Sequence, residues 1–525
     1  MHPTQSEIPN PKSTFLQAPG FPWRVDFASS DGNPGTNDAA AYKTRCEARN
    51  EHSRKRFASA NQPPSRKKTA ANRPRDICKG MASLTPTDAD PTVIASVART
   101  AAESGDLDSL IATAGDRAFV LIGEASHGTH EFYATRADLT RRLIAEKKFR
   151  ILALEADWPD MLRVHRYVTG RSEDKDAAEA LGDFRRFPAW MWRNTVMVEF
   201  VEWLRQWNSQ QPERDRAGIF GMDLYSLHSS IEAVLRYLEK VDPDAAKRAR
   251  HRYACFEFFG PDPQTYGYAT TRGQAESCED EVVAQLIELR RKYGELMRRD
   301  GNVATDEFFY AEQNARLVAN AERYYRSMFR GRDTSWNLRD EHMGQTLHAL
   351  INHFDSGRSR VVVWAHNSHL GDARATEMSA RGEWNVGQLT RERYGDNVFS
   401  IGFSTNSGTV TAASDWGGIA EHKRVRPALA GSYERLFHET GAERFWIDLR
   451  AKNDAVKLLR QRRLERAIGV IYRPETERWS HYFEACLPDQ FDVIIHLDET
   501  RALEPLERSS EWDRGELPET YPEGL

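Results

Sequence analysis

The sequence has few cysteines, no long apolar run and little net charge. Five cysteines among 525 residues, none in a CxxC pair, argue against a disulfide framework and a zinc ribbon and favour a reducing compartment. No apolar run approaches the roughly 18–20 residues that cross a bilayer, and the N-terminus lacks the pattern of a signal peptide. A net charge of -5 argues against nucleic acid as the main partner. We therefore expect a cytoplasmic protein that binds neither membrane nor nucleic acid.

The first 85 residues differ in composition from the rest of the chain. They are rich in Pro, Ser, Asn, Lys and Arg and include the basic run Arg66-Lys67-Lys68. Such a segment cannot bury enough apolar surface to offset the entropy lost on ordering. We expect a disordered basic tail over 1–85, one large folded domain over 90–505, and a second loose tail over 506–525.

Eight short apolar runs predict strands, and helical segments separate them. This alternation is typical of an α/β fold, a mainly parallel sheet covered by helices. The irregular spacing favours an open doubly wound sheet over a closed barrel. The runs are 118–124, 151–156, 218–224, 361–366, 399–404, 444–449, 467–472 and 491–499.

Two segments carry a helical pattern of apolar residues. Residues 131–147 have the periodicity of a first crossover helix. The stretch 279–330, broken near 300–302, is too long for a simple crossover. We expect it to form an added helical hairpin beside the sheet, a candidate wall or lid.

Polar side chains stand at or just after the ends of four successive predicted strands. The carboxyl ends of parallel strands meet at the edge of the sheet where ligands bind, so these side chains are expected to form one site. For Asp223, capping of the next helix is an equally good interpretation. The residues are Glu124 with His127, Glu155, Asp223, and His366 with His369.

His127 is the candidate general base. It lies between Ser126 and Gly128 in a tight loop rather than on an apolar helix face, and histidine is the usual acid–base residue near neutral pH. Glu155 lies within an apolar run, where burial would raise its pKa unless a cation pairs with it. Arg136 or His127 is the expected partner.

Three alternatives stay open from these residues. A nucleophile elbow would need glycine at 124, where Glu124 stands, so Ser126 is a weaker candidate. The Glu124, His127, His366 and His369 side chains supply enough ligands for zinc or iron, although their spacing differs from the common metalloprotease helix. A non-catalytic small-molecule binding protein would retain the same residues.

Three segments resemble the conserved motifs of the erythromycin esterase family. They are 123–129 (GEASHGT) with Arg136, 154–159 (LEADWP) and 364–369 (WAHNSH), and the resemblance extends from about residue 90 to 505. It implies an α/β hydrolase with added helices that opens the lactone ring of macrolides by metal-independent attack of water, without a cofactor. The implied substrate is a small-molecule ester or lactone.

The resemblance also implies roles for individual residues. The first histidine activates water, the two glutamates orient the site, and the arginine and second histidine position substrate or stabilise developing charge. The tetrahedral oxyanion needs donors or positive charge, which the arginine or a protonated second histidine would supply. Asp223 and the tryptophans of the stretch 184–194 are further candidates for substrate contact, although tryptophans pack in cores about as often. The catalytic candidates are His127, Glu124, Glu155, Arg136 and His366, and the substrate-binding candidates are His369, Trp190, Trp192 and Asp223.

Overall fold

The computed structural model describes residues 89–101, 104–260, 262–292, 303–329, 331–354 and 359–514. The basic tail predicted over 1–85 lies outside these residues, as does the helix break predicted near 300–302. None of the helices in the described ranges is long and apolar enough to span a membrane.

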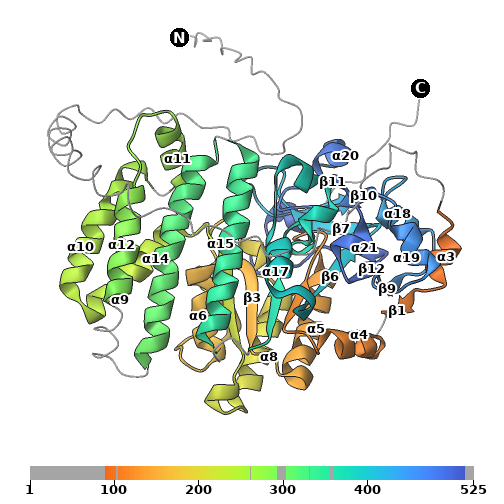
Figure 1. The fold of residues 1–525 in the computed structure, drawn as a ribbon, viewed down its shortest axis with the longest axis horizontal. Coiled ribbons are helices and arrows are strands. Elements are labelled where there is room, and N and C mark those ends of the chain that lie inside the picture. Colours follow the sequence, from red (N-terminus) through yellow and green to blue (C-terminus); the bar gives the residue numbers. More distant parts are fainter. Residues whose placement is uncertain are drawn as a thin grey trace, which may run out of the picture. The chain divides into compact units, whose positions relative to one another are not determined.

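An open sheet of eight strands organises the fold and confirms the predicted α/β class (Figure 1). The strand order is β1-β9-β12-β6-β2-β5-β3-β4. Neighbours from β12 to β4 run parallel, and β9 is antiparallel to both β1 and β12. The strands are β1 Arg99–Thr100, β2 Phe119–Ile122, β3 Ile151–Asp157, β4 Gly218–Asp223, β5 Val361–Trp364, β6 Val398–Ser404, β9 Arg444–Asp448 and β12 Val493–Leu497.

Both faces of the parallel strands are buried, because alternate residues of a strand enter different apolar clusters. In β2, Val120 and Ile122 pack into one cluster, whereas Phe119 and Leu121 pack into the other. The first cluster includes α4 (Asp108–Ala114), α5 (His130–Lys147) and α8 (Thr195–Ser209), and the second includes α9 (Leu227–Val241), α14 (Val303–Ser327) and α15 (Arg332–His353).

The stretch 279–330 contains two packed helices, α12 (Glu279–Arg291) and α14. They are part of a larger helical layer than the sequence predicts, since α9, α10 (Pro243–Tyr253), α11 (Pro263–Thr271) and α15 pack with them (Figure 1). The other α-helices in the described ranges are α3 Pro91–Ala95, α6 Trp158–Val168, α7 Ala177–Ala180, α16 Asn367–Leu370, α17 Val386–Tyr394, α18 Tyr433–His438, α19 Asp454–Leu459, α20 Glu477–Ser480, α21 Leu487–Gln490 and α22 Ser510–Arg514.

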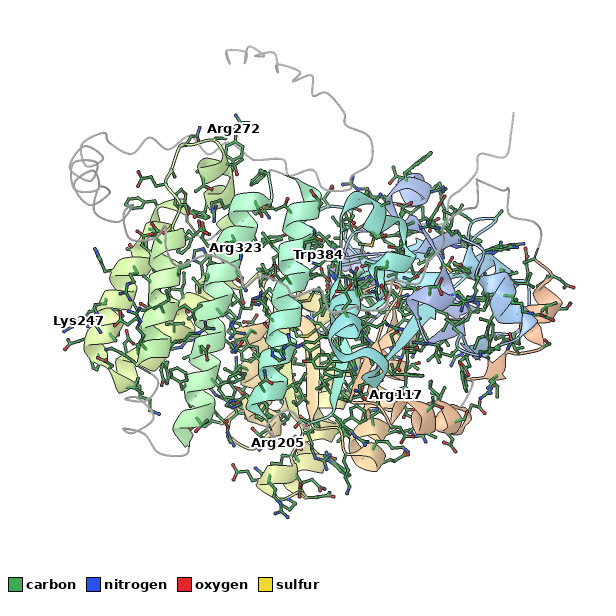
Figure 2. All side chains as sticks on the ribbon, viewed as in Figure 1. Arg117, Arg205, Lys247, Arg272, Arg323 and Trp384 are labelled. Carbon is green, nitrogen blue, oxygen red and sulfur yellow. A yellow bond between two sulfur atoms is a disulfide. The ribbon has the colours of Figure 1, made fainter. Side chains whose placement is uncertain are left out.

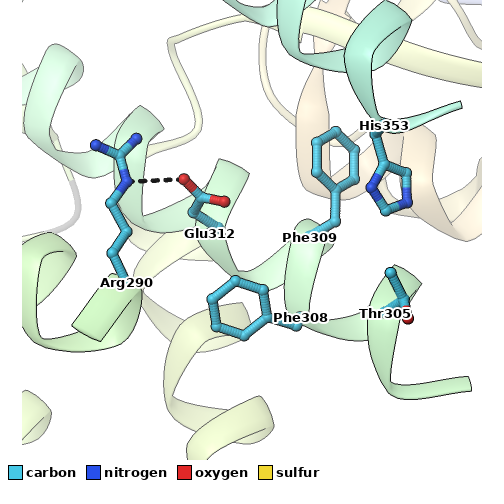
Figure 3. A pocket seen from close by; sticks show the side chains of 6 residues that line it. All are labelled: Arg290, Thr305, Phe308, Phe309, Glu312 and His353. Atoms are coloured by element: carbon cyan, nitrogen blue, oxygen red, sulfur yellow. Dashed lines mark hydrogen bonds and ion pairs between the residues drawn. The ribbon is translucent and has the colours of Figure 1, made fainter. Parts of the chain in front are cut away.

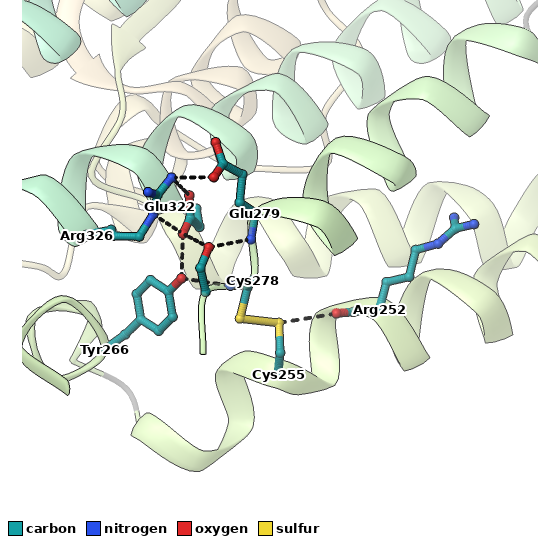
Figure 4. Close-up of a disulfide and its surroundings, with 8 residues drawn as sticks. Arg252, Cys255, Tyr266, Cys278, Glu279, Glu322 and Arg326 are labelled. Atoms are coloured by element: carbon teal, nitrogen blue, oxygen red, sulfur yellow. Dashed lines mark hydrogen bonds and ion pairs between the residues drawn. A yellow bond between two sulfur atoms is a disulfide. The ribbon is translucent and has the colours of Figure 1, made fainter. Parts of the chain in front are cut away.

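A disulfide within this layer differs from the expectation of unpaired cysteines. Cys255, in the short helix η5 (Ala254–Phe259), is bonded to Cys278 at the start of α12 (Figure 4). The Tyr266 hydroxyl accepts a hydrogen bond from the Cys278 backbone amide. The spacing of the cysteines does not predict this pairing, because 23 positions and the helix α11 separate Cys255 from Cys278 and only the packing of the helical layer brings them together.

The run 467–472 does not form the strand predicted for it. Ile468 and Ile471 instead make isolated bridges to two different segments, at Ser126 and Ala413. Strand pairing lies on either side of the run, between β10 (Arg463–Arg466) and β11 (Tyr482–Ala485). Apolar residues of strand length are therefore buried here without a continuous partner strand.

A smaller sheet of β7 (Ser407–Ala412), β8 (Glu421–Val425) and β13 (Glu499–Thr500) lies against the loop that follows β2. The Thr411 amide of β7 donates to the Gly128 carbonyl (2.9 Å), and a Cβ atom at residue 128 would overlap the Thr411 carbonyl. Part of the predicted C-terminal tail is ordered here, since Trp512 of α22 donates to the Thr411 hydroxyl (2.7 Å). Residues 515–525 lie outside the described ranges.

The close approach at residue 128 leads to a stability prediction. We expect Gly128→Ala to destabilise the fold by about 1–3 kcal/mol, because the added methyl group must displace backbone rather than a flexible side chain. Gly344→Ala, inside α15, is the control. The added Cβ would lie 3.6 Å from the Leu389 side chain, an ordinary contact, so this variant should be neutral or stabilise the fold by up to about 1 kcal/mol. Urea denaturation compares the two variants, and equal midpoints would contradict the prediction.

Candidate active site

Polar side chains from the ends of the parallel strands meet at the carboxyl edge of the sheet. The segment after β2 supplies Glu124 and His127, β3 supplies Glu155, and β4 supplies Asp223. The segment after β5 supplies His366 and His369, which belong to the short helix α16 and its cap. All six residues are buried, with exposed fractions of 1–7%.

Glu124 and His127 form a hydrogen-bonded pair. The His127 Nδ1 atom lies 2.9 Å from Glu124 Oε1. Because a carboxylate only accepts, the proton of neutral His127 is on Nδ1, and the lone pair of Nε2 is available. Nε2 lies 4.0 Å from Glu155 Oε1, close enough for electrostatic interaction and long for a direct hydrogen bond.

Backbone hydrogen bonds hold the loop that carries this pair. The Ile468 carbonyl accepts from the His127 amide (3.2 Å), and the Ile468 amide donates to the Ala125 carbonyl (2.9 Å). On the other side, the Asn367 amide donates to the Glu124 carbonyl (2.8 Å). The run 467–472, which the sequence predicts as a strand, thus fixes the position of the candidate base.

Arg136 lies behind Glu124. Its Nη2 atom is 2.9 Å from Glu124 Oε2, and the guanidinium lies over the rings of Tyr133 (4.3 Å) and Trp364 (5.0 Å). Arg136 is fully buried. The described geometry therefore makes it the counter-charge of Glu124, on the side away from the Nε2 atom of His127.

Glu155 is paired with an arginine that the sequence analysis missed. Arg339 of α15 donates from Nη2 to Glu155 Oε1 (2.6 Å) and to Asp223 Oδ2 (2.7 Å), and from Nε to Asp223 Oδ1 (2.9 Å). Burial alone would raise the pKa of Glu155, but the charges of His369 and Arg339 hold it well below its usual range. The pKa of Asp223 is lowered in the same way, because Arg339 outweighs its burial.

His366 differs from His127 in its hydrogen bonds. Its Nδ1 accepts from the Ser368 amide (3.2 Å), so the proton of the neutral ring is on Nε2. Nε2 is buried and makes no hydrogen bond of ordinary geometry with the described residues, although the Ala125 backbone lies near the ring. Burial and the neighbouring His127 hold the pKa of His366 well below its usual range, although Glu155 and the Ala125 backbone act against them. The ring is therefore a neutral donor rather than the protonated one that the sequence analysis considers.

His369 approaches the same carboxylate oxygen of Glu155 as His127 does. Its Nδ1 is 2.9 Å from both carboxylate oxygens of Asp340, and its Nε2 is 3.3 Å from Glu155 Oε1. The Trp336 ring stacks on the imidazole at 4.5 Å. Burial acts to lower the pKa of His369, but Asp340 and Glu155 raise it to about 9 against the opposing charge of Arg339.

Three other candidates have local packing contacts. The Ser126 hydroxyl hydrogen-bonds the Thr129 hydroxyl. Trp190 and Trp192 are buried in the apolar core, where the Trp192 ring lies 6.3 Å from the Tyr133 ring. Their contact with substrate stays a prediction. Within the described ranges, no group of three or more His, Cys, Asp or Glu side chains is arranged to hold a metal ion.

The sequence analysis also missed Trp336 and Asp340, which lie on α15 with Arg339. The signal was weak, because Arg339 and Asp340 resemble the ordinary charged residues of an exposed helix face. Trp384, in the segment before α17, lies near this end of α15, since its backbone carbonyl accepts from Trp336 Nε1 (2.8 Å), and it is 38% exposed (Figure 2).

Fold and site together define an α/β protein with a buried cluster of histidines and carboxylates at the carboxyl edge of a parallel sheet. The family model for erythromycin esterase matches residues 144–500, and the chain belongs to this family. Family membership indicates an esterase-like hydrolase. The matched residues include Glu155, His366 and His369, whereas Glu124, His127 and Arg136 precede them.

Relatives with low sequence identity share the fold. The Bacillus subtilis (strain 168) protein named "Putative hydrolase YbfO" is 22% identical over 428 residues, which cover 76% of this chain and 87% of that protein. A crystal structure of a Bacillus cereus protein superposes with a TM-score of 0.66 at 20% identity, covering 79% and 98% of the two chains. A mutant of the erythromycin esterase EreC in its open conformation gives 0.58 at 16% identity, covering 77% and 96%.

Arg339 is predicted to be essential for stability at neutral pH. Arg339→Gln leaves Glu155 and Asp223 buried without their cation, which should cost about 3–5 kcal/mol at pH 7. Both carboxyl groups have lowered pKa values, so the stability that Arg339 supplies is present above the unfolded-state pKa values near 4 and is lost as the pH falls. The deficit should therefore shrink between pH 7 and pH 4.

Urea denaturation at both pH values measures this difference. Arg236→Gln is the matched control, because Arg236 forms an exposed ion pair with Glu232 and its loss should change stability by less than about 0.5 kcal/mol. An Arg339→Gln deficit no larger than that of the control would contradict the assignment of Arg339 as the cation of the site.

Proposed function

We propose that this protein hydrolyses a carboxylic ester or lactone by attack of water activated at His127. The observation that carries the proposal is the alignment of Glu124, His127 and Glu155. Glu124 fixes the proton on Nδ1 and leaves the basic Nε2 atom facing Glu155 across 4.0 Å. A water molecule that donates to Nε2 and to the Glu155 carboxylate would be oriented for attack.

The charges around this alignment support the role of His127 as base. Arg136 neutralises Glu124 from behind, and Arg339 and His369 keep Glu155 ionised. Glu155 can therefore accept a hydrogen bond from water at neutral pH without taking its proton. His127 is then the group near Glu155 that is arranged to accept the proton, and such a base contributes about 10²–10⁴-fold to rate.

His366 is proposed to stabilise the oxyanion. Its Nε2–H is buried and has no hydrogen bond of ordinary geometry among the described residues, and its ring centroid lies 4.9 Å from that of His127. A donor held in place before the reaction is what a developing oxyanion needs. This use requires His366 to be neutral with its proton on Nε2, in agreement with the hydrogen bond from the Ser368 amide to Nδ1.

The proposed reaction has two steps. The water oxygen bonds to the carbonyl carbon while a water proton moves to His127 Nε2, and the carbonyl π electrons become the oxyanion beside His366. The C–O bond to the leaving oxygen then breaks, and that oxygen takes the proton from His127. An ester gives an acid and an alcohol, and a lactone gives one hydroxy acid that contains one added water.

Macrolide lactones are the substrates to test first. The support is membership of the erythromycin esterase family and the similarity of fold to EreC, which is named as an erythromycin esterase. Hydrolysis of macrolides would make the protein an antibiotic-resistance enzyme. Trp384 is partly exposed, and its backbone carbonyl bonds Trp336, whose ring stacks on His369, so Trp384 is a candidate for apolar contact with substrate.

His127→Asn is predicted to abolish turnover while leaving the fold intact. Asparagine is polar and smaller than histidine but cannot act as a base, so kcat should fall about 10²-fold or more. The measurement is mass spectrometry of erythromycin and of a panel of simple esters and lactones incubated with each protein. Addition of water by the wild type alone supports both the reaction and the base.

The matched control is His438→Asn. His438 also bonds a carboxylate through Nδ1, 2.8 Å from Asp498, but lies on α18 away from the cluster, so its loss should leave turnover unchanged. Full activity of His127→Asn would overturn the proposed base. Turnover of small esters without turnover of erythromycin would remove macrolides as the substrate, and loss of activity with a chelator would favour a metal-dependent hydrolase.

A further inference from the structure

Asp340 is buried and bonded to two parts of the fold. Its Oδ1 accepts from the Val386 amide (2.8 Å), and both of its oxygens lie 2.9 Å from His369 Nδ1. Its exposed fraction is 0%. No mechanism described so far uses Asp340, although a fully buried carboxylate needs a compensating charge.

Neither guanidinium of the cluster forms an ion pair with Asp340 in the described part of the chain, so a cation bonded to Asp340 requires a protonated His369. Burial raises the pKa of Asp340, whereas the charges of His369 and Arg339 oppose this effect. The two guanidiniums, Arg136 and Arg339, are matched to Glu124 and to the Glu155–Asp223 pair. The four carboxylates of the cluster therefore face only two guanidiniums, and the side chain bonded to Asp340 is His369. The Trp336 ring, stacked on the imidazole at 4.5 Å with an interplanar angle of 6°, favours a cation at the same position.

We propose that Asp340 is a positioning residue that keeps His369 an imidazolium with its Nε2–H directed at Glu155. Glu155 then lies between two carboxylate–histidine pairs of opposite function. Glu124–His127 supplies a neutral ring that accepts a proton, and Asp340–His369 supplies a fixed positive charge. The proposal deepens the proposed function and rests on it only for the consequence in catalysis, not for the ionisation state.

All the charged groups that face His369 enter this balance. Asp340 and Glu155 favour the imidazolium, whereas Arg339, whose Nη1 lies 3.1 Å from His369 Nε2, and burial oppose it. His366 on the preceding turn is neutral and adds no charge. If Arg339 dominated, it would donate to an unprotonated Nε2 and His369 would be neutral at pH 7. The two states are therefore distinguishable by experiment.

The test is an NMR titration of histidine-labelled full-length protein from pH 5 to pH 10. The His369 signal is assigned by its loss in His369→Gln. We expect the wild-type ring to stay protonated through neutral pH and to titrate near pH 9, in line with its raised pKa. In Asp340→Asn the titration should move down by about 1–3 pH units, because an opposite charge in contact is removed.

Asp306→Asn is the matched control. Asp306 lies 2.9 Å from His353 Nε2, at the other end of α15 from Asp340. This end of the helix borders a separate pocket of about 270 Å³, lined by His353 with Arg290, Thr305, Phe308, Phe309 and Glu312 (Figure 3). Its loss should leave the His369 titration unchanged. Asp340→Glu, which restores the charge, should recover most of the shift.

Two results would overturn the proposal. One is a wild-type His369 that titrates below pH 7, a result that does not depend on the folding of Asp340→Asn. The other is an Asp340→Asn titration equal to that of the wild type. Because the titration needs no substrate, it tests the ionisation state of His369 even if the protein does not hydrolyse esters. With an active substrate, the alkaline limb of kcat/KM should follow His369, moving to lower pH in Asp340→Asn but not in Asp306→Asn.

Discussion

Burial of charge is the constraint on which this site depends. The four carboxylates of the cluster, Glu124, Glu155, Asp223 and Asp340, are buried, and each would be costly without a cation or a set of donors. The strands and the segments that follow them supply three of these acids and the histidines, but no guanidinium that reaches Glu155. That cation comes from α15, a helix distant in sequence, so the helical layer completes the charge balance that the strands begin. The acids on the strands and the added helices are therefore parts of one electrostatic unit.

This balance gives three neighbouring histidines different properties. His127 has a carboxylate at Nδ1 and an available Nε2 atom. His366 has a backbone donor at Nδ1 and carries its proton on Nε2. His369 has a carboxylate at Nδ1 and another at Nε2. The groups that contact the two ring nitrogens together decide whether each imidazole acts as a base, a neutral donor or a cation.

The sequence predicted the parts of this arrangement that depend on local pattern. Strand periodicity located most of the parallel sheet, and the rule that ligands bind at carboxyl ends singled out Glu124, Glu155 and His366. Arg339 could not be found in this way, because it lies 184 residues from Glu155 in the chain and in the middle of a helix. The run 467–472 was assigned to the sheet because apolar content does not distinguish a strand from a segment that bridges two loops.

Two adjacent residues of α15 bond different groups of the site. Arg339 reaches Asp223 and Glu155, while Asp340 reaches His369 and the backbone of Val386. Their side chains leave the helix about 100° apart, so both are satisfied at only one rotation of α15 about its axis. Insertion or deletion of a single residue earlier in the helix would turn both groups away together. Length variation among relatives should therefore collect in the connections before α15 rather than within it.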